Sequence, residues 1–216
     1  MKKFFVVTVL FALPLVAYLF FASGVNKFAR LPILTENIGS LEGFHGSSGQ
    51  KTSLKGHITV LSFFGKNPLD YTVGAYNLAE KIYDPYHEFK DFQFVSVVEE
   101  GNEAEVAKMI EKLGKVVDMD KWKFVFGSPK EIKQLFESLN TNLVLTEDLA
   151  TQNIFIVDKN ASLRGRNEDD DEGLLFGYDS RSIAEINNKM DDDVKVILAE
   201  YRLELKKYNS NPKNER

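Results

Sequence analysis

The sequence predicts an α/β sandwich, in which helices flank a central mixed sheet, behind an N-terminal transmembrane helix. Three observations indicate this: a long apolar run at the N-terminus, buried-strand patterns that alternate with helical patterns from residue 57 onward, and a late hairpin pattern followed by a long amphipathic helix. The 216 residues, of which 44% are hydrophobic, suffice for one ordinary domain and a short appendage. We expect an anchor or signal segment over 1–24, a linker over 25–32, the domain over 33–207 and a polar tail over 208–216.

The N-terminus indicates a membrane anchor. Lys2 and Lys3 precede residues 4–22, an uncharged and almost wholly apolar run whose length is near the ~20 residues needed to cross a bilayer core as a helix. The two lysines favour a cytoplasmic N-terminus, although basic residues soon after the run weaken the charge contrast. We therefore expect a single-pass protein of the cytoplasmic membrane with an extracytoplasmic, periplasmic domain. The alternative is a signal peptide cleaved near residues 22–24, which would give a secreted protein.

Composition excludes several classes of function. The chain has no cysteine, which rules out disulfides, thiolate metal sites and cysteine nucleophiles and leaves the redox compartment undetermined. The net charge of −5 includes Lys2 and Lys3, so residues 4–216 carry −7. That acidic balance disfavours nucleic acid and anionic lipid as partners.

The domain is expected to begin with a short antiparallel segment and then to alternate strand and helix. Residues 33–55 predict that segment, with a turn at 47–49, because Ser-Ser-Gly is a turn signal. The apolar run 57–64 predicts a buried strand, and a helical pattern over 72–89, interrupted at Pro85, predicts the first helix. The later elements are predicted as strand 92–98, helix 103–115, strand 123–126, a helix from 129, strand 153–157, a hairpin turn at 159–160 leading to strand 162–164, and a closing helix over 180–207.

Capping signals and helical spacing define the later helices. Asn102 with Glu105 predicts an N-cap, and Ser128, followed by proline and then by Glu131, predicts a capping box. The expected inward faces are Val106, Met109, Ile110 and Leu113; Ile132, Leu135, Phe136 and Leu139; and Ile183, Ile186, Met190, Val194, Ile197, Leu198, Tyr201 and Leu205. Successive βαβ units followed by a hairpin and a C-terminal helix indicate a thioredoxin-like sandwich.

The loop after the first core strand is where such a fold places a reactive thiol. The strand leads into Gly-Lys-Asn-Pro at 65–68 and then into a helix that begins near Tyr71. The unpaired amides and positive end of a helix N-terminus favour a thiolate and lower its pKa. Asn67 and Tyr71 stand where sulfur is expected, and a carboxamide and a phenol cannot exchange disulfides.

Several segments together resemble the Sco/SenC family, the membrane-anchored, thioredoxin-fold copper chaperones of cytochrome oxidase. The resemblance spans residues 31–201 and depends on the order and spacing of the segments more than on any one of them. They are Leu-Lys-Gly-His at 54–57 before strand 58–64, Phe-Val-Ser-Val at 94–97, Trp-Lys-Phe-Val-Phe-Gly-Ser at 122–128 and Ile-Val-Asp-Lys-Asn-Ala-Ser-Leu-Arg-Gly at 156–165. In that family a Cys-Pro-x-x-Cys loop follows the first core strand, and a histidine lies a few residues before the strand that ends in Asp.

The family's copper ligands are all substituted in this chain. Carried over by position, the first Cys falls on Asn67 and its proline on Pro68, while the second Cys falls on Tyr71 and the His on Ala150. Two thiolates and an imidazole suit copper, whereas an amide, a phenol and a methyl group do not. The resemblance therefore implies the fold without the copper site, and we expect no metal or other cofactor. No proline precedes strand 153–157, which separates the chain from true thioredoxins.

Other candidate ligands favour structural roles. His45, His57 and His87 are expected to face solvent or to bond to backbone. The acidic run 168–172 carries oxygen ligands but lacks the spacing of an EF-hand, so a solvated loop is expected. Residues 191–193, all aspartate, are expected on the solvent face of the last helix.

Three further features of the sequence are candidates for a site. Asn67 is expected to cap the helix after the proline that follows it. The glycosylation acceptor pattern at 160–162 is interpreted as a hairpin turn. Asp70 beside Tyr71 is the one titratable pair in the right place for acid–base chemistry, which we keep as a minor alternative, and no catalytic residue is expected.

The predicted function is therefore binding without catalysis, in a membrane-tethered domain that serves as an accessory factor in assembly of a respiratory oxidase. The expected partner is a protein, either an oxidase subunit or a cysteine-bearing relative. Pro68 and Tyr71 are the expected contact, because proline limits the loop's conformations and tyrosine offers apolar area with a polar tip. The alternative for Tyr71 is that it packs where the second thiol once stood. Two other functions stay open: copper handling through unconventional ligands, and a thioredoxin-fold binding module of unknown target.

Overall fold

The computed structural model describes residues 4, 10–14, 16, 30–46 and 51–210. Most of the predicted anchor and linker, the turn at 47–49 and the tail from 211 lie outside these residues. Residues 10–14 are helical, and within the described ranges no helix has both the length and the apolar character needed to span a membrane.

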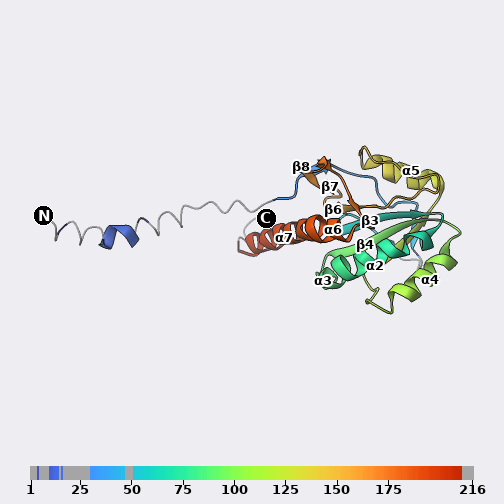
Figure 1. The fold of residues 1–216 in the computed structure, drawn as a ribbon, viewed down its shortest axis with the longest axis horizontal. Helices are drawn as coiled ribbons and strands as arrows, with labels where there is room; N and C mark the ends of the chain where they lie inside the picture. The colour runs from blue at the N-terminus through green and yellow to red at the C-terminus, as the bar shows by residue number, and fades with distance from the viewer. Residues whose placement is uncertain (1–3, 5–9, 15, 17–29, 47–50, 211–216) are drawn as a thin grey trace, which may run out of the picture.

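Among the described residues, the central sheet is mixed and has eight strands. Figure 1 shows β3, β4 and β6 of this sheet between the helices. β3 (Ile58–Gly65), β4 (Phe92–Glu99) and β5 (Trp122–Gly127) are parallel neighbours, and β6 (Asn153–Val157) lies antiparallel to β3 on its other side. The remaining strands are β1 (Ile33–Thr35), β2 (His45–Gly46), β7 (Leu163–Arg164) and β10 (Tyr178–Asp179), with β8 (Arg166–Asp169) and β9 (Gly173–Leu175) in a separate hairpin. The order across the sheet is β1-β7-β6-β3-β4-β5-β2, and β10 pairs with β6, so the predicted mixed sheet is confirmed.

Helices cover both faces of this sheet. The helical elements are η1 (Pro68–Tyr71), α2 (Thr72–Leu78), η2 (Ala79–Tyr83), α3 (Asp84–Tyr86), α4 (Glu103–Leu113), α5 (Pro129–Ser138), α6 (Ile183–Glu185), η3 (Ile186–Met190) and α7 (Asp191–Ser210). α2, α4 and α7 pack on one face, and α5 packs on the other. In β3, Val60 and Phe64 join the first core while Leu61 and Phe63 join the second, which explains why the strand is apolar without alternation.

The first segment of the domain differs from the predicted one. β1 pairs with β7 and β2 pairs with β5, so the two strands lie at opposite edges of the sheet. Between them the chain crosses the face that α5 covers and buries Ile38 and Leu41 in that core. The expected local antiparallel pairing is therefore wrong, because each strand finds its partner at a sheet edge far away in the sequence.

The helix after β3 passes through Pro85 without ending there. A π-helical turn over Ala79–Tyr83 comes just before the proline, and the helix continues to Tyr86. Proline in a regular helix would clash with the carbonyl four residues earlier, and a widened turn relieves this clash. The predicted interruption is thus a local widening of the helix.

Capping is confirmed at one helix and wrong at another. Ser128 and Glu131 form the predicted capping box, in which the amide of Ser128 donates to the Glu131 carboxylate at 2.8 Å. Asn102 makes no side-chain cap bond, because its amide group donates instead to the carbonyl of Glu99.

The closing helix packs mostly as predicted. Ile186, Met190 and Val194 are fully buried against the sheet. Ile183 and Leu205, also predicted to face inward, are 52% and 49% exposed. These two lie near opposite ends of the helical stretch, where the helical period continues but the sheet beneath it does not.

Candidate functional site

The three residues that the sequence analysis matched to copper ligands, Asn67, Tyr71 and Ala150, come from two segments that meet at the end of β3. Phe64 and Ala150 form an isolated antiparallel bridge, which places the segment before β6 beside the last residues of β3. The amide of Lys66 donates to the carbonyl of Asp148 at 2.9 Å. The amide of Thr151 donates to the carbonyl of Phe63 at 3.0 Å. The backbone therefore holds the loop at 65–71 and the segment at 146–151 together.

Asn67 does not cap the helix that follows it. Its side chain is exposed and makes no cap hydrogen bond, and the first turn, Pro68–Tyr71, is a 3₁₀ turn. The amide of Asp70 donates to the backbone carbonyl of Asn67 at 3.1 Å. The expected side-chain cap is therefore wrong, because the tighter turn satisfies this amide from the main chain.

Tyr71 is half-buried and packs on the strand below it. Its ring stacks on Phe64 with 5.5 Å between ring centroids and an interplanar angle of 21°. Burial raises the pKa of the Tyr71 phenol above its ordinary value. The negative charges of Asp148 and Asp70 add to this rise, and the nearby side chain of Thr146 opposes it. The phenol consequently stays protonated at neutral pH, whereas metal ligation through oxygen favours the phenolate.

Ala150 offers the site no ligand atom. It is fully buried, and its amide donates to the hydroxyl of Thr146 at 3.4 Å. Leu149 before it has a φ of 60°, an uncommon conformation for a bulky residue. Asn67, Tyr71 and Ala150 thus present an amide, a protonated phenol and a methyl group.

Arg181, which the sequence analysis did not single out, completes the surroundings of Tyr71. Its positive charge lowers the pKa of the Tyr71 phenol, in opposition to burial. The guanidinium is held by Asp179, with Nη2 2.7 Å from the carboxylate. The turn that carries Arg181 packs closely on α2, where a Cβ at Gly74 would lie 2.3 Å from the Ser180 hydroxyl. No local sequence signal marks Arg181, because it comes near Tyr71 only in the folded chain.

The histidines occupy separate surroundings. Nδ1 of His57 lies 3.3 Å from the carbonyl of Lys55, and Nδ1 of His87 lies 2.9 Å from the carbonyl of Asp84. Nε2 of His45 lies 3.7 Å from the carboxylate of Glu103. Among the described residues, no group of three or more His, Cys, Asp or Glu side chains is arranged to hold a metal ion.

Two aspartates that were expected in solvent are buried instead. Asp169 accepts from Lys189 Nζ at 2.7 Å, and Asp193 accepts from the Tyr178 hydroxyl at 2.6 Å and from Arg166 Nε at 2.7 Å. The expectation of a wholly solvated acidic loop and a wholly exposed Asp triplet is wrong at these positions. Both carboxylates are buried in ion pairs that join β8 to the last helical stretch. Asp169 of β8 pairs with Lys189 of η3, and Arg166 of β8 pairs with Asp193 of α7.

The predicted hairpin turn at 160–162 is confirmed. The carboxylate of Asp158 accepts from the amides of Asn160 at 2.9 Å and Ser162 at 3.0 Å. Arg164 Nη1 donates to the same carboxylate at 3.0 Å. The polar pattern at 160–162 is therefore accounted for by the turn between β6 and β7.

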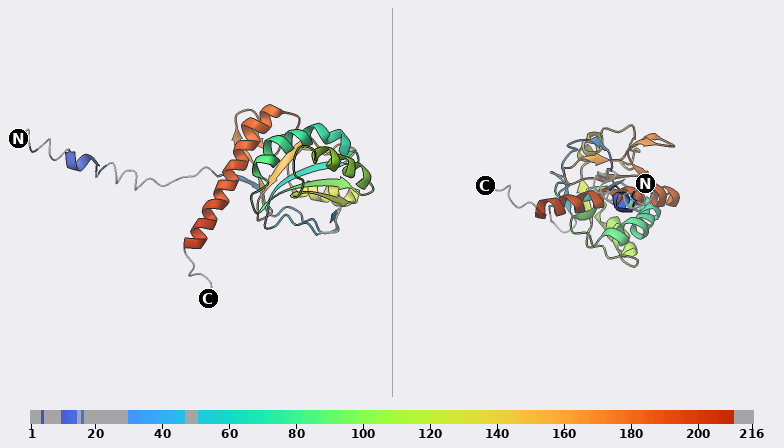
Figure 2. Two further views of the ribbon diagram at one scale, coloured as in Figure 1. Left: turned by 90° about the horizontal axis from the view of Figure 1, so that it is seen from below. Right: turned by 90° about the vertical axis from the view of Figure 1, so that its left-hand side faces the viewer.

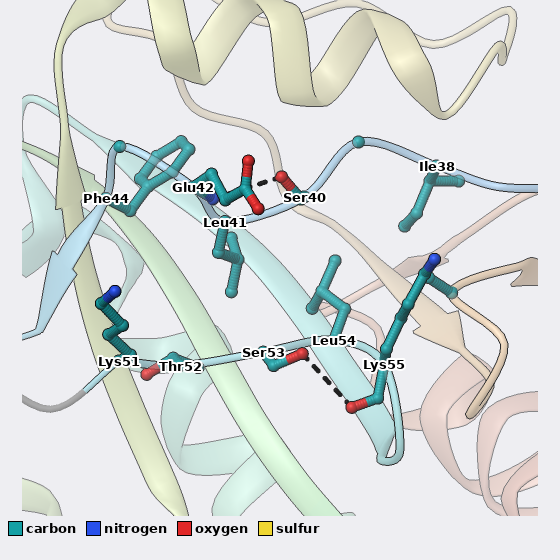
Figure 3. A pocket seen from close by; sticks show the side chains of 13 residues that line it. Ile38, Ser40, Leu41, Glu42, Phe44, Lys51, Thr52, Ser53, Leu54 and Lys55 are labelled. Atoms are coloured by element: carbon teal, nitrogen blue, oxygen red, sulfur yellow. Dashed lines mark hydrogen bonds between the residues drawn. The ribbon is translucent and has the colours of Figure 1, made fainter.

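A hollow of about 600 Å³ lies elsewhere, between the chain segments at 38–44 and 51–55 (Figure 3). Leu41 and Leu54 give it apolar walls, and Lys51 and Lys55 also line it. It shares no residue with the Tyr71 loop, so it adds nothing to that site.

Comparison with known proteins gives similarity at the level of the fold. Neither protein-family models nor curated protein sequences gave a match. A candidate protein disulfide isomerase from Bacteroides thetaiotaomicron has a TM-score of 0.50 and 8% identity over 79% of this chain and 95% of its own. BsSco, a member of the Sco family of cytochrome c oxidase assembly proteins, has a TM-score of 0.47 and 17% sequence identity over 77% of this chain and 94% of its own. ScoI of Arabidopsis thaliana, with copper bound, has a TM-score of 0.44 and 16% sequence identity over 74% of this chain and 98% of its own.

These likenesses concern architecture alone, because all three identities are low. The strand order, the parallel β3-β4-β5 core and the helices on both faces agree with a thioredoxin-like α/β fold. What this chain can do must therefore be argued from its own loop at 65–71.

Proposed function

We propose that this chain is a membrane-tethered, Sco-like binding protein without redox or copper chemistry, which acts as an accessory factor in assembly of a respiratory oxidase. The proposal places the domain on the extracytoplasmic, periplasmic side of the cytoplasmic membrane. Its partner is a protein, either an oxidase subunit or a cysteine-bearing relative. The oxidase link rests on the sequence resemblance to the Sco/SenC family, and the binding role rests on the loop at the end of β3.

The observation that carries the proposal is the chemistry at the three family ligand positions. Asn67, Tyr71 and Ala150 supply no thiolate and no imidazole, and the phenol of Tyr71 has a raised pKa. The backbone nevertheless holds the two segments together as an ordered surface. A surface that keeps its shape without its reactive groups is suited to recognition.

The test of the binding role compares two variants of the full chain in native membranes after crosslinking. Tyr71→Ala removes the aromatic contact, and we expect it to weaken partner capture by roughly 1–3 kcal/mol, as for an interface hot spot. It also removes the stack on Phe64, so some stability is lost as well.

Ile110→Ala serves as the matched control for that loss. Ile110 is a partly buried residue of α4 that packs on the same core away from the loop. Ile110→Ala is expected to lower the melting temperature about as much as Tyr71→Ala does, while partner capture persists. If Tyr71→Ala lowers the melting temperature and every co-purified partner is retained, Tyr71 has a packing role only and the proposed contact is wrong.

A further inference from the structure

Among the described residues, the apolar side of the C-terminal helix ends in an exposed leucine. Met190, Val194 and Ile197 form the fully buried side of the helix, Tyr201 continues it half-buried, and Leu205 follows in the same helical register at 49% exposed. Figure 2 shows α7 extending past the body of the domain. The side of the helix that packs on the core thus continues in the same register to Leu205, whose side chain is half exposed.

This projecting end lies beside the point where the chain comes from the predicted anchor. Arg30 Nε lies 3.6 Å from Glu200 of α7, and Arg164 Nε donates to the carbonyl of Leu31 at 2.7 Å. Only residues 23–29 separate Arg30 from the apolar run at 4–22, and seven residues span at most about 25 Å. An anchor in the bilayer therefore keeps the end of α7 near the membrane surface.

Charge is distributed very unevenly along the chain. Residues 31–201 contain 18 basic and 30 acidic residues, a net charge of −12. Residues 202–216 contain five basic and two acidic residues, a net charge of +3, and Arg202, Lys206 and Lys207 lie in α7 itself. The acidic average of the whole chain, which disfavours anionic lipid as a partner, does not describe this end.

We propose that the projecting end of α7, residues 202–207, lies on the membrane and binds anionic lipid headgroups beside the anchor. The proposal rests on the membrane tethering of the proposed function. Basic residues next to an exposed leucine on a helix suit the interface, where the apolar side enters the headgroup boundary and the cations meet lipid phosphates. Residues 31–201, with a net charge of −12, are repelled by the same anionic surface. The repulsion favours an orientation in which only the end of α7 contacts the membrane.

The orientation has a consequence for the Tyr71 loop. Gly56, before the amino end of β3, bonds to Lys159, whose amide in turn donates to the hydroxyl of Tyr201 in α7. The Tyr71 loop follows the carboxyl end of β3, about 26 Å away for a strand of eight residues. The loop therefore faces away from the bilayer.

The absence of native cysteine allows a direct test with single-site probes. The full-length L205C variant, labelled with an environment-sensitive fluorophore, is reconstituted into vesicles of phosphatidylcholine with or without phosphatidylglycerol. We expect a blue-shifted emission in the phosphatidylglycerol vesicles and a smaller shift in phosphatidylcholine alone. Changing Arg202, Lys206 and Lys207 to Gln should abolish the lipid-dependent part. A V144C variant, labelled at an exposed loop position before Ala150, should keep a water-like emission throughout.

The outcomes separate this proposal from the one on which it rests. A chain that enters the vesicles while the label at position 205 stays water-like overturns the docking of α7 and leaves the tether intact. A chain that fails to enter the vesicles overturns both the tether and the docking. A blue shift that does not depend on phosphatidylglycerol or on the Gln substitutions overturns the lipid proposal. Disulfide crosslinking between two unlabelled L205C chains would then identify a second copy as the occupant.

Discussion

Tyr71 has the environment of a packed aromatic with an exposed part, not that of a metal ligand. It stacks on Phe64, and its pKa is raised chiefly by burial. Asn67, four residues earlier, is exposed and free of a cap bond, so its side chain is not needed by the helix. The residues at the loop thus leave its outer surface available while removing the chemistry of a dithiol.

The first prediction at this scale concerns copper. The domain from Leu31 onward should bind Cu(I) or Cu(II) no better than an unrelated acidic protein, because no thiolate or imidazole stands at the ligand positions. Metal retained after dialysis against a weak competitor is the measurement. The double variant Asn67→Cys, Tyr71→Cys is the positive control and should gain Cu(I). Stoichiometric copper on the unaltered domain would refute the prediction and favour unconventional ligands.

A second prediction concerns acid stability. A hydrogen bond from Lys189 is the main cause that lowers the pKa of Asp169 below its ordinary value. A lowered folded-state pKa stabilises the fold above the unfolded value of about 4, and this stabilisation is lost as the pH falls through the folded-state pKa. Asp169→Asn should cost about 1–3 kcal/mol at neutral pH, and the difference from the unaltered protein should shrink below about pH 4.

Urea unfolding at a series of pH values measures this difference. Glu168→Gln, at the exposed neighbouring position, is the control and should change the unfolding free energy by less than about 0.5 kcal/mol at any pH. Parallel pH profiles for the unaltered protein and Asp169→Asn would contradict the assignment.

At the scale of elements, the sequence predicts what depends on local pattern and misses what depends on distant partners. The strand at 57–64 and the capping box at Ser128 are both confirmed. Burial on two faces and a helix cap can each be recognised from residues that are neighbours in the sequence. The edge positions of β1 and β2 cannot be recognised in this way. These strands have only three and two residues, and their places in the sheet are set by pairing with β7 and β5. Leu205 shows the same limit, because helical spacing continues whether or not a core lies below it.

The candidate site divides in the same way. Its location at the end of β3 follows from the strand, loop and helix pattern. Ala150 was named only through the family resemblance, and its bridge to Phe64 is seen only in the folded chain. The part played by Arg181 and the burial of Asp193 depend on contacts that only the folded chain creates. The spacing of residues along the sequence does not predict these contacts.

Gly65 gives the prediction for this scale. Its φ is 56°, and a Cβ there would lie 1.9 Å from the carbonyl oxygen of Asp148. Gly56 has a φ of 86° with nothing within 4 Å of such a Cβ, so it shares the left-handed backbone without the clash. Gly56→Ala should cost about 1–2 kcal/mol from backbone conformation. Gly65→Ala should cost about 1–3 kcal/mol more, because the segment at 146–151 must move.

Urea unfolding of both variants provides the comparison. Equal losses would mean that the two segments at the end of β3 are not in the tight apposition described above. A larger loss in Gly65→Ala, accompanied by loss of partner capture, would connect that apposition to binding.

For the whole molecule, we expect the predicted anchor to decide where the domain works. The apolar run at 4–22 predicts that the full chain stays in the membrane fraction at high salt and is released by detergent. Leu13→Arg, in the middle of the run, should disfavour insertion by about 3 kcal/mol, whereas Leu13→Ile should leave it unchanged. Fractionation and N-terminal sequencing test this, and a mature protein that begins near residue 25 would show that the run is a cleaved signal.

The backbone bonds that join Lys66 to Asp148 and Thr151 to Phe63 have a thermodynamic consequence for any partner of the loop. Residues that the fold has already fixed lose little conformational freedom on association, so the entropic cost of forming the complex falls mainly on the partner. Such a surface selects by shape, and it favours a partner segment that can adapt to it. For the proposed binding role, the loop therefore acts on a partner through a surface that exists before the two meet.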